Sequence, residues 1–180
     1  MLAIISGVSG AGKNTVIQRL LKEFDNIFYF KSATTRPRRE GEDFYDYMTD
    51  AEFVAKKNAG EFFETECTHG FWYATQNKEL EKIVQNPHNI YIKDIDVHGN
   101  KKLREHFKTK ATVVSIFLDA PDDVLYQRLI SRGESDERAR VRLSRGKMER
   151  EHKHDYDLVI ENLDLDKTVN TIKEFIKSRL

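Results

Sequence analysis

A single cysteine, Cys67, occurs in this 180-residue sequence, and no apolar run approaches the roughly 20 residues that a membrane-spanning helix needs. One cysteine cannot form an internal disulfide, which is typical of a protein kept in a reducing compartment. The 30 basic residues are balanced by 30 acidic ones, and a net charge of zero argues against a nucleic-acid backbone as the main partner. The opening residues, MLAIISGVSG, contain no basic leader. We therefore expect a cytoplasmic protein that binds neither a membrane nor nucleic acid.

Short apolar runs alternate with segments of helical period along most of the chain. Residues 2–6 resemble a buried strand, and apolar residues recur at helical spacing in 14–24. Further strand-like runs lie at 91–96, 112–120 and 157–162, and helical segments separate or follow them. One face of the final helix is predicted to contain four apolar residues: Val169, Ile172, Ile176 and Leu180. This order predicts an α/β fold with an open parallel sheet and helices on both faces.

Two stretches depart from this alternation. Residues 33–87 are rich in aromatic side chains and irregular, so we expect a small inserted subdomain there. Residues 126–153 are basic and helical, which would suit a mobile lid. The segments 1–32, 88–125 and 154–180 form the expected core of one globular domain, since the chain is 39% hydrophobic.

Residues 7–15, GVSGAGKNT, match a phosphate-binding loop at every position but one. Small residues let backbone N–H groups face phosphate oxygens, the following helix favours negative charge at its N-terminus, and Lys13 can reach the β- and γ-phosphates. Asn14 stands where serine or threonine usually holds magnesium; its amide oxygen can still ligate the ion weakly or accept from a metal-bound water, with Thr15 or water completing the shell. The loop residues expected to bind ATP are Gly7, Ser9, Gly10, Ala11, Gly12, Lys13, Asn14 and Thr15.

Five further motifs follow the loop in the order found in guanylate kinases, and the chain resembles that family over nearly its whole length. They are SATTRPRREGE at 32–42, GEFFET at 60–65, HGFWYAT at 69–75, DIDVHG at 94–99 and RLISRG at 128–133. The resemblance implies a P-loop nucleoside monophosphate kinase that converts ATP and GMP into ADP and GDP with Mg²⁺ as cofactor. It also implies that the subdomain binds GMP. The chain could act as a monomer or a homodimer.

The resemblance further implies which residues bind GMP. Arg36 and Arg39 offer forked donors to the phosphate, although this segment could instead be a solvated charge run. Glu64 can accept from both N1–H and the 2-amino group of guanine, a pairing that adenine cannot reproduce. Ser32 and Thr75 would meet O6. The full set is Ser32, Arg36, Arg39, Tyr45, Glu64, Tyr73, Thr75 and Asp96.

Several of these positions have plainer explanations. Glu64 and Thr75 could face solvent on alternating strands, and Asp96, expected to meet the amino group, could cap the following helix. The segment before Tyr45 is about three residues shorter than is usual in the family, which leaves Tyr47 as a substitute. Ala74 replaces a usual glycine.

Phosphoryl transfer requires charge neutralisation more than a strong base, because the attacking phosphate oxygen is already anionic. The resemblance implies five catalytic residues: Lys13, Arg36, Arg128, Arg132 and Arg142. The lid is one residue shorter than usual, so Arg138 or Arg140 could share this role, whereas Arg145, Lys147 and Arg150 fit a salt-bridged surface helix better. Asp94 is the expected carboxylate near magnesium, together with Asn14, and Asn162 is expected near the adenine of ATP.

Lys93 lies in a strand that the family keeps apolar. Three interpretations are open: this strand is less buried than usual, the Lys93 amine reaches the ligand, or the amine forms an ion pair with a neighbouring acidic residue. Two other functions stay open: a binding module of the same fold that has lost catalysis, and a kinase for another phosphorylated acceptor. The intact lysine and arginines argue against the first, and the guanine-binding set argues against the second.

Overall fold

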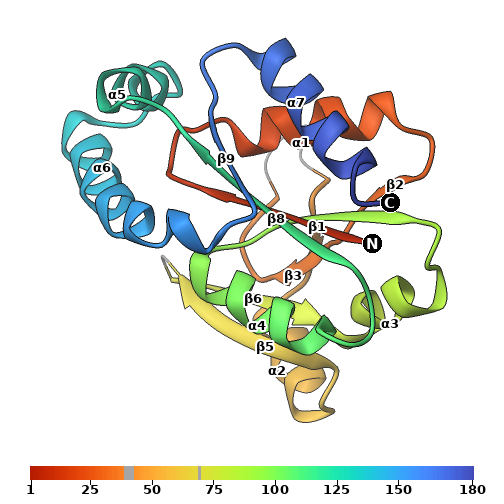
Figure 1. The fold of residues 1–180 in the computed structure, drawn as a ribbon. Coiled ribbons are helices and arrows are strands. Elements are labelled where there is room, and N and C mark those ends of the chain that lie inside the picture. Colours follow the sequence, from red (N-terminus) through yellow and green to blue (C-terminus); the bar gives the residue numbers. More distant parts are fainter. Residues whose placement is uncertain (39–42, 69) are drawn as a thin grey trace.

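A five-stranded parallel sheet forms the centre of the protein, in a computed structural model that describes residues 1–38, 43–68 and 70–180 (Figure 1). The strand order is β2-β7-β1-β8-β9, and every recorded pairing in it is parallel. The strands are β1 (Leu2–Gly7), β2 (Ile27–Tyr29), β7 (Ile90–Asp94), β8 (Val113–Asp119) and β9 (Leu158–Glu161). The predicted α/β fold is confirmed.

Helices cover both faces of this sheet. On one face, α1 (Lys13–Glu23) and α7 (Leu165–Lys177) pack against β1 and β8 through residues such as Ile17, Leu20 and Ile172. On the other, α3 (Asn77–Gln85) and α4 (Val97–Phe107) bury Ile83 and Phe107 (Figure 1). Two apolar cores therefore hold the central strands, and burying each large apolar side chain contributes about 1.5–3 kcal/mol.

A second sheet of four strands lies beside the first, with the order β4-β3-β6-β5. Its strands are β3 (Ser32–Thr34), β4 (Tyr45–Tyr47), β5 (Phe62–Thr68) and β6 (Phe71–Gln76). Helix α2 (Asp50–Asn58) buries Phe53 against Trp72 and Phe62. The region predicted to be irregular is thus regular, and its first strand begins one residue before the predicted boundary.

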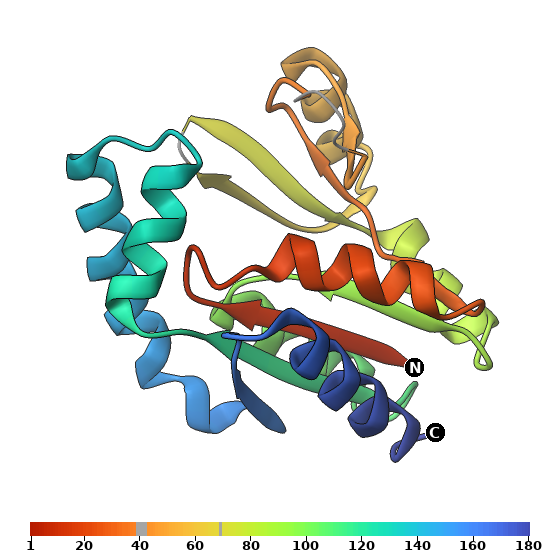
Figure 2. The ribbon, with the colours of Figure 1, turned by 90° about the horizontal axis from the view of Figure 1, so that it is seen from above.

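Two helices connect β8 to β9: α5 (Asp122–Ser131) and α6 (Asp136–Glu151), followed by the 3₁₀ turn η1 (Lys153–Asp155). Figure 2 shows this pair rising at the end of the sheet where the loop after β1 lies. Arg150 fixes the base of α6, because its guanidinium donates to Asp119 at 2.9 Å and to Asp122 at 2.6 Å. Among the described residues, no helix is both long and apolar enough to cross a membrane.

Two predictions about the last elements are wrong in part. Leu180 was expected on the buried face of the final helix, but α7 ends at Lys177 and Leu180 is 71% exposed. The run at 157–162 does form the expected strand of the parallel sheet, β9, but not in its core, because β9 lies at the edge of the sheet and Val159 is 43% exposed. Three turns of α7, with Val169, Ile172 and Ile176 buried, already cover this part of the sheet, so the chain end is not needed there.

Candidate functional site

A cleft of about 640 Å³ opens at the carboxyl ends of β1 and β7, bounded by the second sheet on one side and by α6 on the other. Ligands of open α/β folds bind at this edge of the sheet. Eleven of the predicted site residues line the cleft: Gly7, Ser9, Lys13, Ser32, Tyr45, Glu64, Tyr73, Thr75, Asp94, Asp96 and Arg142. The fold therefore brings together residues that are up to 135 positions apart, from Gly7 to Arg142.

The loop between β1 and α1 has the backbone geometry that its glycines permit. Gly10 and Gly12 have φ angles of +90° and +92°. A Cβ atom on Gly7 would lie 2.1 Å from the carbonyl oxygen of Leu118, so no larger residue fits there without displacing the backbone. The Lys13 Nζ donates to the Gly7 carbonyl at 2.6 Å and to the Val8 carbonyl at 3.3 Å. Burial lowers the pKa of Lys13, against the opposing charges of Glu149 and Asp94.

Asn162 and Arg128 lie behind this loop and do not line the cleft. The buried Asn162 side chain donates from Nδ2 to the Ala11 carbonyl at 2.7 Å, and a Cβ atom on Gly12 would lie 2.6 Å from the same nitrogen. Arg128 Nη2 donates to the backbone carbonyl of Asn162 at 2.7 Å. In this arrangement the two residues support the loop.

Four predicted GMP-binding positions form one row across the second sheet. In the strand register, Tyr45 pairs with Ser32, Ser32 pairs with Thr75, and Thr75 pairs with Glu64. Directly opposed residues share a face of a sheet, so all four side chains point to the same side. Thr75 Oγ1 donates to Glu64 at 3.2 Å, and Glu64 also pairs with Lys102 at 3.0 Å. Thr75 is buried and Glu64 half-buried in the cleft, so their alternative as solvent-facing residues is wrong.

A β-bulge turns Glu64 into this row. Phe62 of β5 pairs with Gln76 of β6, and Glu64 of β5 pairs with Thr75 of β6. Between these two pairs β5 advances by two residues and β6 by only one. Phe63 is therefore the extra residue, and it packs against the ring of His106 on α4 at a centroid distance of 4.8 Å. Without the bulge, Phe63 would lie opposite Thr75 and Glu64 would point to the other face.

The remaining expected GMP residues take varied positions. Asp96 accepts from the Gly99 N–H at 2.7 Å and so caps α4, which was the structural alternative to a role in binding GMP. It also lines the cleft. The Arg36 guanidinium lies over the rings of Tyr45 and Tyr47, 5.4 and 6.0 Å from their centroids, and is not among the cleft-lining residues. Tyr45 lines the cleft and Tyr47 does not. Arg39 lies outside the described residues.

One face of α6, in the segment predicted to be a lid, lines the cleft on the side opposite the second sheet. Arg142 donates to Ser9 Oγ at 3.0 Å and pairs with Glu134 at 2.9 Å. Arg145 and Glu149 also line the cleft, although the sequence favoured a surface role for Arg145 and no role was expected for Glu149. The spacing 142, 145, 149 places all three on one helix face and could have revealed them. Burial raises the pKa of Glu149, and its Oε2 atom is buried and has no hydrogen-bond partner among the residues that the structure describes.

The other lid arginines do not line the cleft. Arg132 is exposed at the end of α5, although its positive charge contributes to lowering the pKa of Lys13. Arg140 pairs with Asp136 at 3.0 Å on the exposed side of α6, and Arg138 is exposed beside it. Arg142 is therefore the only one of the three predicted lid arginines that faces the cleft in the described part of the chain.

Magnesium ligands were expected at Asn14 and Asp94. Asp94 lines the cleft and accepts a hydrogen bond from the Tyr29 hydroxyl. Asn14 and Thr15 are exposed in the first turn of α1. The parts of the chain that are described hold no cluster of three acidic, histidine or cysteine side chains suited to a metal. Mg²⁺ in kinases needs only one or two protein oxygens besides the phosphates and water, so this donor set fits the ion.

Lys93 is almost completely buried, with 1% of its surface exposed. Its Nζ donates to Ser32 Oγ at 2.6 Å and lies 4.4 Å from the centroid of the Phe30 ring. The strand is therefore not less buried at this point, and the amine contacts a member of the expected GMP set. Burial lowers the pKa of Lys93 to about 8, despite the nearby charges of Asp94, Glu64 and Glu79.

The depressed pKa predicts that Lys93→Met stabilises the fold at pH 7. Lysine has an ordinary pKa of 10.5, so the folded protein binds this proton less tightly than the unfolded chain. Above pH 10.5 the amine is neutral in both the folded and the unfolded protein, so burying it does not lower the free energy of unfolding through its charge. As the pH falls from there through about 8, where the buried amine becomes charged, the free energy of unfolding decreases. At pH 7 the charged form thus costs up to about 3 kcal/mol, which methionine removes. Urea unfolding at pH 7 and pH 10 measures this: the variant should be more stable at pH 7, by a margin that shrinks at pH 10, and a less stable variant at pH 7 would contradict it.

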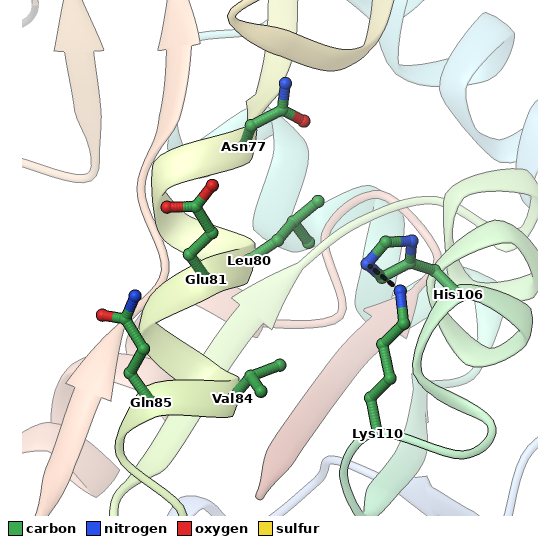
Figure 3. A pocket seen from close by; sticks show the side chains of 7 residues that line it. All are labelled: Asn77, Leu80, Glu81, Val84, Gln85, His106 and Lys110. Atoms are coloured by element: carbon green, nitrogen blue, oxygen red, sulfur yellow. Dashed lines mark hydrogen bonds between the residues drawn. The ribbon is translucent and has the colours of Figure 1, made fainter.

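A second, smaller hollow of about 380 Å³ lies between α3 and the end of α4 (Figure 3). The side chains of Leu80 and Val84 face it from α3, and Lys110 Nζ lies 3.4 Å from His106 Nε2 on its other side. It shares no lining residue with the large cleft and contains no predicted site residue. The large cleft is therefore the candidate site.

The chain is similar to known guanylate kinases over nearly its whole length. The family model described as guanylate kinase matches residues 1–179. Guanylate kinase from Agrobacterium fabrum is 36% identical over 99% of this chain and 82% of that protein, and guanylate kinase from Thermotoga maritima is 31% identical over 98% of this chain and 86% of that protein. The crystal structure of guanylate kinase from Anaplasma phagocytophilum superposes with a TM-score of 0.77 at 29% identity, covering 99% of this chain and 85% of that one. With its phosphate-binding loop, its row of polar residues on the second sheet and these matches over nearly its whole length, the chain belongs to the guanylate kinase family.

Proposed function

We propose that this protein transfers the γ-phosphoryl group of ATP to GMP, giving ADP and GDP. One observation carries the proposal beyond family membership: Lys13 and the row that contains Ser32, Thr75 and Glu64 line the same cleft. A phosphate-binding end and a base-binding end are what a nucleoside monophosphate kinase needs, because the two substrates must meet with their phosphates in line.

The ATP end of the cleft would use the loop and α6. Backbone N–H groups of residues 7–15 would bind the β-phosphate, and Lys13 would exchange its loop carbonyls for phosphate oxygens. Arg142, bound to Ser9 at 3.0 Å, already lies next to the loop and would neutralise charge on the transferred group. Arg145 lines the same side and would add a second positive charge. Arg128 and Asn162 would act by supporting the loop from behind.

The GMP end would use the second sheet. Glu64 would accept from N1–H and the 2-amino group of guanine, exchanging its pair with Lys102 for the base. Ser32 and Thr75 would meet O6, Asp96 the amino group, and Arg36, Arg39, Tyr45 and Tyr73 the phosphate. The part of the expected subdomain at 33–87 that forms the second sheet, without α3, which packs on the central sheet, would then close over the substrates together with the lid at 126–153. Closure would exclude water and prevent ATP hydrolysis.

Mg²⁺ would neutralise charge on the β- and γ-phosphates, with Asp94 binding through water and Asn14 offering its amide oxygen. Because a side-chain amide is a bulkier ligand than a hydroxyl, Asn14→Ser should lower the Mg²⁺ concentration that gives half-maximal activity, by roughly 3–10-fold. A magnesium titration at saturating ATP and GMP measures this. Asn14→Ala is the control and should raise the requirement; a serine variant that needs more Mg²⁺ than the parent would refute a metal role for this position.

Release of ADP from Mg-ATP, measured with GMP, AMP or no acceptor, tests the proposed function. GMP-dependent release is expected, with AMP at least a hundredfold less efficient, since a site built to bind N1–H rejects a base that lacks it by large factors. ATP and GMP binding without turnover in calorimetry would favour the binding-module alternative. Turnover with a ribose phosphate but not with GMP would favour the other kinase.

A further inference from the structure

Lys93 occupies a position that the proposed reaction does not use, yet it contacts the base-binding end of the cleft. It is the last residue but one of β7 on the central sheet and is 1% exposed. Ser32, its hydrogen-bond partner at 2.6 Å, begins β3 in the second sheet and lines the cleft. The contact therefore joins the buried core to a side chain that is open to a ligand.

The chemistry of the two groups fixes the direction of this hydrogen bond. A charged lysine amine has three donors and no acceptor, whereas a serine hydroxyl has one donor and two lone pairs. While Lys93 is protonated, Ser32 Oγ must accept, so its own O–H hydrogen points elsewhere. A charged donor also polarises the hydroxyl that accepts from it, which makes that hydroxyl a stronger donor.

Three carboxylates surround Lys93, but each of them has another partner, and the Lys93 amine donates its hydrogen bond to Ser32. Asp94 follows it on β7 and accepts from Tyr29, Glu64 on β5 pairs with Lys102 of α4, and Glu79 on α3 pairs with Lys82. These three carboxylates act on Lys93 through their charge, and within the described residues none forms an ion pair with it. The amine is thus kept near the base-binding row without being neutralised by one partner.

We propose that Lys93 is a positioning residue that holds Ser32 as a hydrogen-bond donor, so that the cleft selects purine nucleotides with a 6-oxo group against those with a 6-amino group. An oxo group at position 6 only accepts, whereas an amino group there presents donors to the Ser32 hydrogen. The inference deepens the proposed function and rests on it, because it takes Ser32 to meet the base at that position.

A double-mutant cycle tests the inference. Lys93→Met should raise KM for GMP about tenfold with little change in kcat, as expected for the loss of one charge-assisted hydrogen bond in the bound state. In the background of Ser32→Ala the same change should have no further effect, since the lysine acts through the serine. Lys82→Met removes a surface lysine that pairs with Glu79 and is the matched control; it should leave both constants unchanged.

The choice of substrate gives a readout that general damage to the fold would not give. The monophosphate of 2-aminopurine riboside keeps the 2-amino group but lacks both the 6-oxo group and N1–H, so it should bind weakly as an inhibitor against GMP. Lys93→Met should leave its inhibition constant unchanged. Equal losses for this nucleotide and for GMP would overturn the inference, as would a full Lys93 effect in the Ser32→Ala background. Lys93→Leu, a second apolar replacement, should reproduce the methionine result.

A parent protein without GMP-dependent turnover would refute the proposed function rather than the role of Lys93, before any variant is compared.

Discussion

Replacing Lys13 by methionine is expected to lower kcat by about 10²–10³ while leaving the fold intact, a loss typical of removing one preorganised charge-stabilising donor. Lys13 Nζ is the one lysine amine among the described residues that lines the cleft beside the loop, where it binds the carbonyls of Gly7 and Val8. Water can donate to those carbonyls when the lysine is absent, whereas no other lysine would stabilise the charge that develops on the transferred phosphoryl group. We therefore expect the substitution to lower kcat.

Stability should not explain this loss. The loop shape depends on Gly7, Gly12 and the hydrogen bond from Asn162 to Ala11, which the substitution does not touch. Burial already disfavours the Lys13 charge, so the melting temperature of Lys13→Met should equal or exceed that of the parent. Steady-state kinetics and thermal unfolding measure both effects. Lys22→Met, an exposed lysine in the last turn of the same helix, is the control, and a Lys13→Met kcat within threefold of the parent would contradict the assigned role.

Replacing Glu64 by glutamine is expected to lower kcat/KM for GMP by about 10²–10⁴, because two hydrogen bonds to a charged acceptor contribute roughly 1.5–3 kcal/mol each. The glutamine amide keeps one acceptor oxygen and turns an N–H₂ group toward guanine N1–H or its amino group, where donor would meet donor. KM for ATP should stay unchanged, since Glu64 lies on the second sheet and the loop lies on the first. Activity with AMP should not fall in parallel.

The same substitution should scarcely change stability. Its partner Lys102 is 61% exposed, and ion pairs with such exposed groups contribute little. Glu61→Gln is the matched control, because Glu61 lies just before β5, is exposed and pairs with Lys56. Steady-state kinetics with GMP, AMP and ATP varied in turn distinguish a loss of guanine recognition from a general loss of activity. A parallel loss for every nucleotide, or none for GMP, would show that Glu64 does not read the base.

Part of the central sheet could be predicted from local pattern because β1 and β8 are mostly apolar, with only Ser115 and Asp119 as polar residues in β8. Strand β1 and helix α1 also flank a loop whose glycines and lysine have fixed spacing. Strand β2, by contrast, has only three residues, Ile27 to Tyr29, which is too short for a periodicity to be recognised. It forms because its backbone pairs with β7.

The row of Tyr45, Ser32, Thr75 and Glu64 on the second sheet illustrates what the local sequence pattern cannot predict. Strict alternation along β5 would place Phe63 and Thr65 on one face and Glu64 on the other, but the bulge at Phe63 shifts the register by one residue. The bulge is recognisable only when the partner strand is known. Resemblance to a family therefore identified Glu64 where alternation left it open, and the register now gives the physical reason why its side chain faces the cleft.

Lys93 was the least expected feature, because hydropathy assigns a lysine to the surface. Its amine lies over the Phe30 ring and donates to Ser32 on the neighbouring sheet. Arg145 and Glu149 were missed for another reason: α6 is polar on all sides, so no apolar stripe indicated which face turns inward. In both cases tertiary contacts decide the position of a charged residue.

The most direct test of the central claim follows the label of γ-phosphate-labelled ATP with GMP, dGMP, AMP, CMP, UMP and ribose phosphates offered separately. With GMP, we predict that one label enters GDP for each ADP formed and that free inorganic phosphate stays at background. AMP, CMP and UMP should receive at most about a hundredth as much label, because a site that binds N1–H discriminates strongly against bases that lack it or present it differently. Label that appears in an acceptor without a guanine base, or only in inorganic phosphate, or nowhere although the protein is folded, would contradict the assignment of phosphoryl transfer to GMP in this cleft.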